Sequence, residues 1–461
     1  MNYEAKKFFE YINGKNITFC GIGRSNIKLI DMFLAAGANI TVCDKNVGFK
    51  NTEAYDNLSS KGVNFVLGDH YLDNLNADII FRTPGISYLK NEFTKARFSG
   101  TIVTSEMEVF FKLCPCKIYA VTGSDGKTTT TTIISNILKN AGYNVHIGGN
   151  IGDPLLYRIN SIDKDDVVVV ELSSFQLMSM KKSPDVCVVT NISPNHLDFH
   201  KDMDEYVKSK ENIITHQDAF GKAVLNADND VKNFALKSIG SCLFFSRLHN
   251  VHYGTYVRDK DIIYSDKKGQ TFIMKTTDIK LKGLHNLENY LAAISAVFDD
   301  VPVDAIVKTA KEFTGVEHRT EFVRKVNGVS YFNDSIASSP TRTISGTLSL
   351  YDEKIILIAG GYDKHIPFDE LGDVVSQKVK LLILMGDTAQ KIKKAVENSK
   401  YYDKNKIEII KVASMDDAVS LAYKKASYHD VVSLSPACAS FGLYKNFEER
   451  GRHFKKLVNK L

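Results

Sequence analysis

Ile118-Tyr119-Ala120-Val121-Thr122-Gly123-Ser124-Asp125-Gly126-Lys127-Thr128-Thr129 is an apolar strand that runs into a glycine-rich loop, and a helical pattern follows from Thr130. Strand, loop and helix in this order form a phosphate-binding loop of the T-G-x-x-G-K-T form. In such a loop the backbone N–H groups surround phosphates, Lys127 reaches the terminal phosphates, and the Thr128 hydroxyl can bind Mg²⁺. The stretch therefore predicts an α/β domain that binds a nucleoside triphosphate. The alternative is a basic helix N-terminus with chance glycines.

Two further apolar strands are expected downstream, and polar residues follow each of them. Residues 167–170 are an unbroken valine run, typical of a buried parallel strand, which delivers Glu171 to the strand's carboxyl end. Behind a phosphate-binding loop, Glu171 fits a magnesium carboxylate. The strand at 186–189 leads toward His196, and a helix expected from about Asp204 carries Lys210. Taken alone, His196 is more typical of a structural residue, and Lys210 of a solvated lysine.

The N-terminal part alternates short β-branched runs with helical patterns, which predicts a parallel α/β unit with strands at 17–20, 40–42, 78–81 and 102–103. The first strand runs into Gly21-Ile22-Gly23-Arg24-Ser25-Asn26, where a tight turn precedes a helix that offers its N–H groups to a phosphate. Asp44 ends the second strand, near the position that reads a ribose or base in such folds. Asn26 replaces the third glycine of a dinucleotide fingerprint, so the turn is either structural or binds a nucleotide diphosphate.

A third α/β unit is expected from about Val316, with a last helix from about Asn446 and strands at 329–332, 355–359, 381–384, 407–410 and 431–434. Polar or glycine clusters follow several of these strands, at 333–335, 360–364, 386–387 and 435–440. Each cluster could be a simple turn. Their recurrence at the edge where parallel sheets bind ligands favours a site there.

Composition sets broad limits on the function. A chain of 461 residues with 44% hydrophobic residues is long enough for two or three domains, and no run approaches the roughly 20 apolar residues of a membrane span. The N-terminus shows no export signal, so we expect a soluble cytoplasmic protein. Seven scattered cysteines indicate reduced, mostly buried thiols, and a net charge of +5 without long basic runs argues against nucleic-acid binding.

Four motifs together resemble the Mur ligase family: the loop at 122–129, Gly148-Gly149-Asn150-Ile151-Gly152, Glu171-Leu172-Ser173-Ser174-Phe175-Gln176-Leu177 and Leu284-His285-Asn286-Leu287-Glu288-Asn289. Two C-terminal motifs look like those of the members that add D-glutamate: Ser435-Pro436-Ala437-Cys438-Ala439-Ser440 and Lys445-Asn446-Phe447-Glu448-Glu449-Arg450-Gly451. The resemblance covers essentially the whole chain.

This resemblance implies an α/β protein of three domains: a Rossmann-like UDP-binding domain at 1–104, a P-loop ATPase-like domain with a mainly parallel sheet at 105–315, and a Rossmann-like domain at 316–461 that brings in the amino acid. It implies an ATP-dependent ligase in cytoplasmic peptidoglycan precursor synthesis. ATP would phosphorylate the L-alanine carboxylate of UDP-N-acetylmuramoyl-L-alanine, and the amine of D-glutamate would attack the acyl phosphate. We expect a monomer without nucleic-acid or membrane partners.

The resemblance also implies roles for individual residues. The matches to ATP contacts are Gly123, Ser124, Asp125, Gly126, Lys127, Thr128, Thr129, Asn289, Arg319 and Asp334. The matches to contacts with the UDP-substrate are Arg24, Ser25, Asn26, Asp44, Gly85 and Asn150. The D-glutamate pocket would contain Lys364, Ser440, Phe447 and Ser338. Two magnesium ions would lie among Thr128, Glu171, His196 and Lys210, with Lys210 converted to a carbamate. The catalytic group would be Lys127, Glu171, His196 and Lys210.

Two departures from the family pattern put details in doubt. Ile336 and Ser338 stand where some members carry lysine and threonine, and Asn195 stands where a carboxylate is frequent. Four alternatives stay open: a sister ligase that adds another amino acid or a dipeptide, a folate polyglutamate synthase, a non-catalytic nucleotide-binding regulator, and a nicotinamide oxidoreductase built on the first glycine turn.

Overall fold

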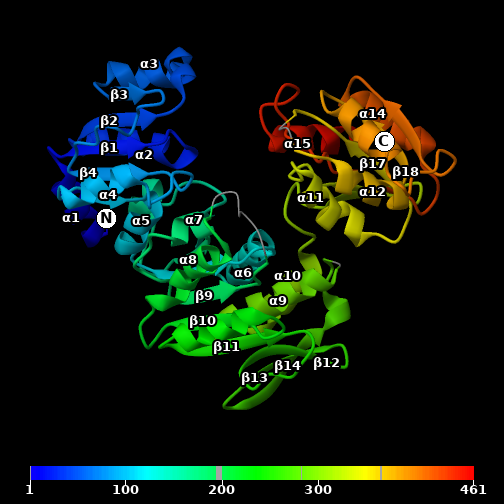
Figure 1. Cartoon of the computed structure of the whole chain (residues 1–461). Coiled ribbons are helices and arrows are strands. Elements are labelled where there is room, and N and C mark those ends of the chain that lie inside the picture. The colour runs from blue at the N-terminus through cyan, green and yellow to red at the C-terminus, as the bar shows by residue number, and fades with distance from the viewer. Residues whose placement is uncertain (1, 194–199, 282, 364–365) are drawn as a thin grey trace. The chain divides into compact units, whose positions relative to one another are not determined.

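The computed structural model shows an α/β protein with mostly parallel sheets, which confirms the predicted fold class (Figure 1). It describes residues 2–193, 200–281, 283–363 and 366–461. The chain forms two compact units, Met1–Phe313 and Thr314–Leu461. The first unit contains two sheets and the second contains one.

The first sheet is entirely parallel, with the order β3-β2-β1-β4-β5. Its strands are β1 (Asn16–Cys20), β2 (Asn39–Asp44), β3 (Asn64–Leu67), β4 (Ile79–Arg82) and β5 (Ile102–Thr104). Its helices are α1 (Tyr3–Ile12), α2 (Arg24–Ala35), α3 (Glu53–Ser60) and α4 (Asn91–Phe98). The chain leaves β1 toward β2 and later returns to its other side as β4. The carboxyl ends of β1 and β4 therefore flank a switch point, where open α/β sheets bind ligands.

The second sheet has the order β14-β13-β12-β11-β10-β9-β6-β8-β7. Its parallel strands are β6 (Lys117–Thr122), β7 (Val145–Gly149), β8 (Val167–Glu171), β9 (Val186–Val189), β10 (Lys222–Asn226), β11 (Ser241–Ser246) and β12 (Gly254–Arg258). Two antiparallel strands, β13 (Asp261–Asp266) and β14 (Gly269–Lys275), extend one edge. The phosphate-binding loop follows β6, which lies between β8 and β9, so the ends of all three strands meet at one edge.

Helices cover both faces of this sheet, which explains the valine run (Figure 1). Val167 and Val169 pack with α6 (Lys127–Asn140), α9 (Leu284–Val297) and α10 (Val303–Glu312). Val168 and Val170 belong to the core of the opposite face. That face is covered by α5 (Glu106–Leu113), α7 (Ser174–Leu177), α8 (Met203–Thr215) and the short helix η2 (Leu156–Ser161). A strand that is buried on both sides has no polar face, so its sequence is apolar throughout.

The third sheet has the order β15-β16-β20-β17-β18-β19, parallel except for the β15–β16 pair. Its strands are β15 (Glu321–Val326), β16 (Val329–Asn333), β17 (Ile355–Ala359), β18 (Val379–Leu384), β19 (Glu408–Lys411) and β20 (Val431–Leu434). Its helices are α11 (Pro340–Thr343), α12 (Asp369–Lys378), α13 (Ala389–Glu397), α14 (Met415–Lys425) and α15 (Phe447–Val458). Because β20 lies between β16 and β17, the polar clusters after these three strands share one edge.

Two global properties accompany this fold. All seven cysteines are free thiols, and four of them are buried, as the sequence predicted. Within the described ranges, no helix is long and apolar enough to cross a membrane.

Candidate active site

The phosphate-binding loop has the backbone that its glycines allow. Gly126 has a φ of +79° and caps α6, which begins at Lys127 and not at Thr130 as the sequence suggested. The earlier start follows from Gly126, because its left-handed conformation lets the next residue enter the helix. Gly123 has a φ of +147°, and a Cβ there would lie 1.9 Å from the Thr190 hydroxyl oxygen. The N–H groups at the start of α6 receive no side-chain cap and can donate hydrogen bonds to an anion.

Residues after β9 hold this loop from the side. The Ser124 N–H donates to the Asn191 carbonyl, and the Asp125 N–H donates to the Asn191 side-chain oxygen, both at 2.9 Å. The Thr190 hydroxyl donates to the Asp125 carbonyl at 2.6 Å. The sequence analysis gave no role to Thr190 or Asn191. The available signal was their position directly after a buried strand.

Glu171 is the best-organised carboxylate at this edge. It ends β8, is 2% exposed and accepts two side-chain hydrogen bonds. The Thr128 hydroxyl donates to Oε2 at 2.7 Å, and the Asn150 amide donates to Oε1 at 2.8 Å. The structure thus brings together three predicted site residues from helix α6, the end of strand β8 and the loop after β7.

Two lysines reach the same loop. The Lys127 ammonium donates to the carbonyls of Gly123 and Ser124, both at 2.9 Å. Lys210, on α8, is 2% exposed and donates to the Gly123 carbonyl at 2.9 Å and to the Thr122 hydroxyl at 3.3 Å. Burial, with help from the charge of Lys127, lowers the pKa of Lys210 to about 7, although Glu171 opposes this shift. A buried neutral amine is chemically competent to react with CO₂.

Tyr206 joins Lys210 to the loop and was missed by the sequence analysis. Its hydroxyl lies 2.9 Å from the Ser124 hydroxyl, and its ring centroid lies 4.8 Å from the Lys210 nitrogen. Spacing of four residues places Tyr206 and Lys210 on the same face of α8, and this spacing was the available signal.

His196 lies outside the described residues. The nearby His200 is buried, and its imidazole contacts the Ser174 hydroxyl at 2.9 Å and the Glu205 carboxylate at 3.1 Å. It also stacks on Phe175 with a centroid distance of 5.2 Å. The helix after Glu171 and the start of α8 are therefore joined through His200.

Asn289, predicted to contact ATP, lies directly behind the phosphate-binding loop. It is 5% exposed, and its side-chain oxygen accepts from the Thr130 hydroxyl at 3.1 Å. A Cβ on Gly126 would lie 2.4 Å from this oxygen. Its amide nitrogen donates to the Asn286 side chain at 3.3 Å. In this structure Asn289 supports the loop from α9.

The predicted UDP-substrate residues other than Asn150 come from the loops and the helix at the switch point of the first sheet, whereas Asn150 lies beside Glu171 in the second sheet. The Asp44 carboxylate accepts from the Ile22 N–H at 2.6 Å and from the Asn46 N–H at 2.7 Å, so it fixes the glycine turn. Asn26 is buried and donates to the Gly21 carbonyl at 2.9 Å. Gly85 is exposed, with open space where a Cβ would stand. Arg24 and Ser25 begin α2, and their side chains lie outside what the structure describes.

Asp334 and Arg319 lie in the second compact unit. Asp334 follows β16, is 3% exposed and accepts from the Ser435 hydroxyl at 2.7 Å and from the Thr320 N–H at 3.2 Å. Burial raises the pKa of Asp334 to about 6, while these hydrogen bonds and the positive charge of Arg319 oppose the shift. Asp334 is therefore an organising group for the loop that carries Arg319.

The predicted D-glutamate residues also lie in this unit, except that Lys364 falls outside the described residues. Ser440 is buried, Ser338 is half-buried, and Phe447 begins α15. Arg450, which the sequence analysis quoted only within a motif, ties their loops together. Its guanidinium donates to the Ser335 carbonyl at 2.8 Å and to the Cys438 carbonyl at 3.1 Å.

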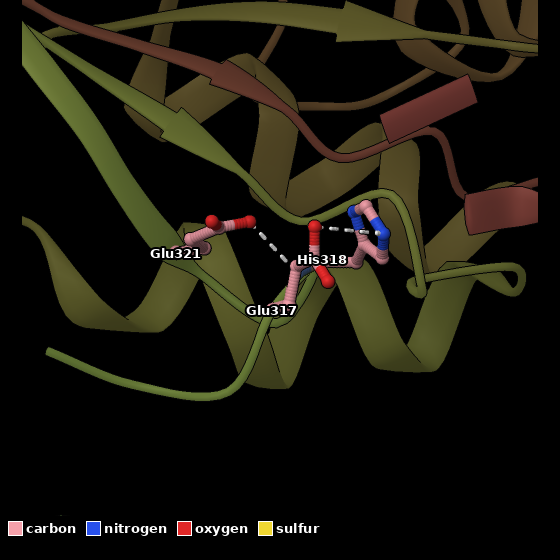
Figure 2. A group of neighbouring side chains, drawn as sticks. All are labelled: Glu317, His318 and Glu321. Carbon is pink, nitrogen blue, oxygen red and sulfur yellow. Dashed lines mark hydrogen bonds and ion pairs between the residues drawn. The ribbon is translucent and has the colours of Figure 1, made fainter. Parts of the chain in front are cut away.

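Figure 2 shows a second group of titratable side chains, Glu317, His318 and Glu321, whose potential ligand atoms lie within 4.8 Å of one another. The Lys455 ammonium forms ion pairs with Glu317 at 3.1 Å and with Glu321 at 2.5 Å. The His318 Nδ1 is 2.8 Å from the Asn333 amide nitrogen. Because Lys455 already neutralises both carboxylates, we interpret the group as an ion-pair network between β15 and α15.

Comparison with known proteins agrees with this geometry. The family description "Mur ligase middle domain" matches residues 121–297, and "Mur ligase, glutamate ligase domain" matches residues 318–438. The chain belongs to the Mur ligase family. It is 51% identical over 465 residues to the UDP-N-acetylmuramoylalanine--D-glutamate ligase of Acetivibrio thermocellus, with 100% of both chains covered. It is 47% identical over 463 residues to the protein of the same name from Clostridium botulinum strain 657, again with 100% of both chains covered.

Solved structures show the same fold at lower identity. The MurF ligase of Thermotoga maritima, solved in complex with ADP, is 18% identical, with a TM-score of 0.56 over 98% of this chain and 97% of that one. The UDP-N-acetylmuramate-alanine ligase of the same organism is 18% identical, with a TM-score of 0.58 over 97% of this chain and 99% of that one.

Proposed function

We propose that the chain is an ATP-dependent ligase that joins D-glutamate to UDP-N-acetylmuramoyl-L-alanine in peptidoglycan precursor synthesis. Full-length identity of 51% and 47% to two proteins named for this reaction supports the substrate pair. The structural observation that carries the chemistry is Glu171, which is hydrogen-bonded to both Thr128 and Asn150 beside Lys127. We assign nucleotide-substrate binding to residues 1–104, ATP binding to 105–315 and amino-acid binding to 316–461.

The Thr128 hydroxyl and the Glu171 carboxylate fit magnesium. The Thr128 hydroxyl and a Glu171 carboxylate oxygen lie 2.7 Å apart, and both are hard oxygen ligands of the kind Mg²⁺ prefers. We assign the ion to Thr128 and Glu171, with His196 and Lys210 completing sites for two ions. Bound there, magnesium would neutralise phosphate charge and polarise the transferring phosphoryl group.

Lys210 fits modification to a carbamate because of its burial. Its nitrogen is removed from water and, within the described part of the chain, donates to the Thr122 hydroxyl and the Gly123 carbonyl and not to a carboxylate. Desolvation disfavours the ammonium, and an ammonium would repel a metal ion. A carbamate would instead offer an anionic oxygen. A carbonyl signal on Lys210 in ¹³C NMR after growth in ¹³CO₂ tests this modification.

The chain's own groups account for the two chemical steps. Lys127 and the N–H groups after Gly126 would hold the terminal phosphates of ATP while the γ-phosphoryl group passes in line to the L-alanine carboxylate. Asn150, held by Glu171, would orient the acceptor. The deprotonated amine of D-glutamate then attacks the acyl carbon, and phosphate leaves. Lys127 stabilises the negative charge that develops in both steps.

The second unit would supply the remaining contacts. Arg319 and Asp334 are assigned to the phosphate and ribose of ATP, and Lys364, Ser338, Ser440 and Phe447 to D-glutamate. Guanidinium and ammonium groups suit phosphate and carboxylate recognition. We also infer that the enzyme works as a monomer in the cytoplasm, where its free thiols remain reduced.

The test is phosphate release by the full chain with ATP, Mg²⁺ and UDP-N-acetylmuramoyl-L-alanine. Release should depend on D-glutamate and not on L-glutamate, L-alanine, L-lysine or meso-diaminopimelate. Dependence on another amino acid would contradict the D-glutamate assignment and indicate a sister ligase. No release with any acceptor would contradict catalysis and indicate a nucleotide-binding regulator.

A further inference from the structure

Arg82 is a buried cation at the end of β4, directly before the turn that contains Gly85. It is 1% exposed, and burial lowers its pKa. Its Nε atom has no hydrogen-bond partner. Burying a guanidinium is costly unless its hydrogen bonds are satisfied. We therefore examine which parts of the chain the Arg82 guanidinium connects.

The guanidinium of Arg82 joins the two sheets of the first compact unit. On its own side, Nη1 donates to the Ile86 carbonyl at 3.2 Å. Across the boundary, Nη2 donates to the Ser179 hydroxyl at 2.5 Å and makes a long contact of 3.5 Å with the Phe175 carbonyl. Ser179 in turn hydrogen-bonds Glu108, whose carboxylate favours the charged form of Arg82.

Both ends of this connection lie beside the proposed reaction. On one side, the turn at 83–86 packs on the glycine turn after β1, because a Cβ on Gly21 would lie 2.4 Å from the Thr83 hydroxyl oxygen. On the other side, Phe175 belongs to the helix that begins three residues after Glu171. Arg82 thus connects the switch point of the first sheet with α7, the helix that follows the proposed magnesium carboxylate Glu171.

We propose that Arg82 is a positioning residue that holds the sugar-nucleotide turn in register with the Glu171 segment. In-line phosphoryl transfer requires the acceptor carboxylate at a fixed distance from the γ-phosphate. The acceptor is carried by the UDP-substrate and the phosphate by the loop after β6, so the two sheets must be held together. The planar fork of arginine lets two different nitrogen atoms donate on the two sides, Nη1 to Ile86 and Nη2 to Ser179. This inference rests on the proposed function.

The experiment compares Arg82→Met with Arg97→Met in the full chain. Arg97 is the matched control because both guanidinium groups face the Tyr88 ring, at 5.5 Å from the centroid for Arg82 and 4.3 Å for Arg97. Within the described part of the chain, Arg97 donates hydrogen bonds to Thr94 and to the Tyr88 carbonyl, on its own side of the boundary. For Arg82→Met we expect the KM for UDP-N-acetylmuramoyl-L-alanine to rise at least about tenfold, the loss typical of one hydrogen bond to a charged group. The KM for ATP and the affinity for ADP should stay within about twofold of wild type. Arg97→Met should change none of these values.

A second variant keeps the test valid if Arg82→Met folds poorly. Ser179→Ala removes the same contact from the other side and leaves the charge in place. It should raise the same KM, and the double variant should be no worse than Arg82→Met alone. A role in folding alone would lower the active fraction, and so kcat, without changing either KM. An unchanged KM for the UDP-substrate in both single variants overturns the inference.

The outcome is separable from that of the proposed function. Calorimetry measures the affinity for UDP-N-acetylmuramoyl-L-alanine without ATP. This affinity tests the turn beside Arg82 whether or not turnover occurs. If the wild type shows no D-glutamate-dependent turnover, the proposed function fails, and equal binding by wild type and Arg82→Met then overturns the role of Arg82 as well.

Discussion

Glu171 illustrates what single residues reveal before a structure is known. Its place at the end of a buried strand was predicted from the valine run and is confirmed. Its partners Thr128 and Asn150 were both singled out, but their hydrogen bonds to it were not predictable, because they lie 43 and 21 residues away in the chain. Thr190 and Asn191 were passed over because short polar residues after a strand are also typical of ordinary turns. The sequence around a residue predicts whether its side chain is buried, but it does not predict as well which side chains it will contact.

Lys127 carries the prediction at this scale. Lys127→Ala should lower kcat for D-glutamate-dependent phosphate release by about a hundredfold or more, because the variant removes a positive charge aimed at the charge that develops in transfer. Lys139→Ala, in the last turn of the same helix α6, is the control and should keep wild-type activity. Equal activity in the two variants would refute the role of the loop.

At the scale of elements, the strand order explains why the sites form where they do. β6, β8 and β9 are neighbours, and so are β16, β20 and β17, so loops from distant parts of the chain share one edge. The apolar runs predicted these strands, but their order depends on packing between distant segments. Eight strands were not predicted: β3, β7, β10, β11, β12, β13, β14 and β15.

Two glycines that flank α6 allow a matched comparison of alanine substitutions. Gly126→Ala combines a left-handed backbone with a Cβ placed 2.4 Å from the Asn289 side chain, so it should abolish ADP binding. Gly142→Ala, just beyond the other end of α6, has a φ of +97° but open space around it. This control should cost only about 1–2 kcal/mol of stability and keep ADP binding. Calorimetry with ADP and thermal unfolding of both variants check the contrast, and normal ADP affinity in Gly126→Ala would contradict it.

The contact between α5 and η2 predicts a dependence of stability on pH. The Glu106 carboxyl accepts from the Leu156 N–H at 2.8 Å, and burial raises its pKa to about 7. Between about pH 4.5 and 7 the folded protein holds a proton that the unfolded chain has released, so this group's stabilisation is full at lower pH and is lost as the pH rises to about 7. The difference is on the order of a few kcal/mol.

Denaturant unfolding of Glu106→Gln measures this effect. The stability difference between the variant and wild type should change in favour of the variant as the pH rises from 5 to about 8. Glu53→Gln, at an exposed position that begins α3, is the control and should follow the wild type throughout. Parallel pH curves for wild type and Glu106→Gln would contradict the account.

At the scale of the whole molecule, the sequence predicted an α/β architecture, and the three mostly parallel sheets agree with it. Periodic apolar runs carry this information because a parallel sheet buries both of its faces. The connection made by Arg82 could not be predicted, since a single charged residue at the end of a strand is more typical of an exposed position. Links between sheets depend on how folded parts meet, which local sequence patterns do not encode.

The central claim is that the chain phosphorylates a carboxylate and passes it to the amine of D-glutamate. The most direct measurement uses UDP-N-acetylmuramoyl-L-alanine labelled with ¹⁸O in the alanine carboxylate, together with ATP, Mg²⁺ and D-glutamate. Mass spectrometry should find one ¹⁸O atom in each released phosphate and a product heavier by one glutamyl residue. Phosphate without the label, or release without the heavier product, would contradict transfer through an acyl phosphate.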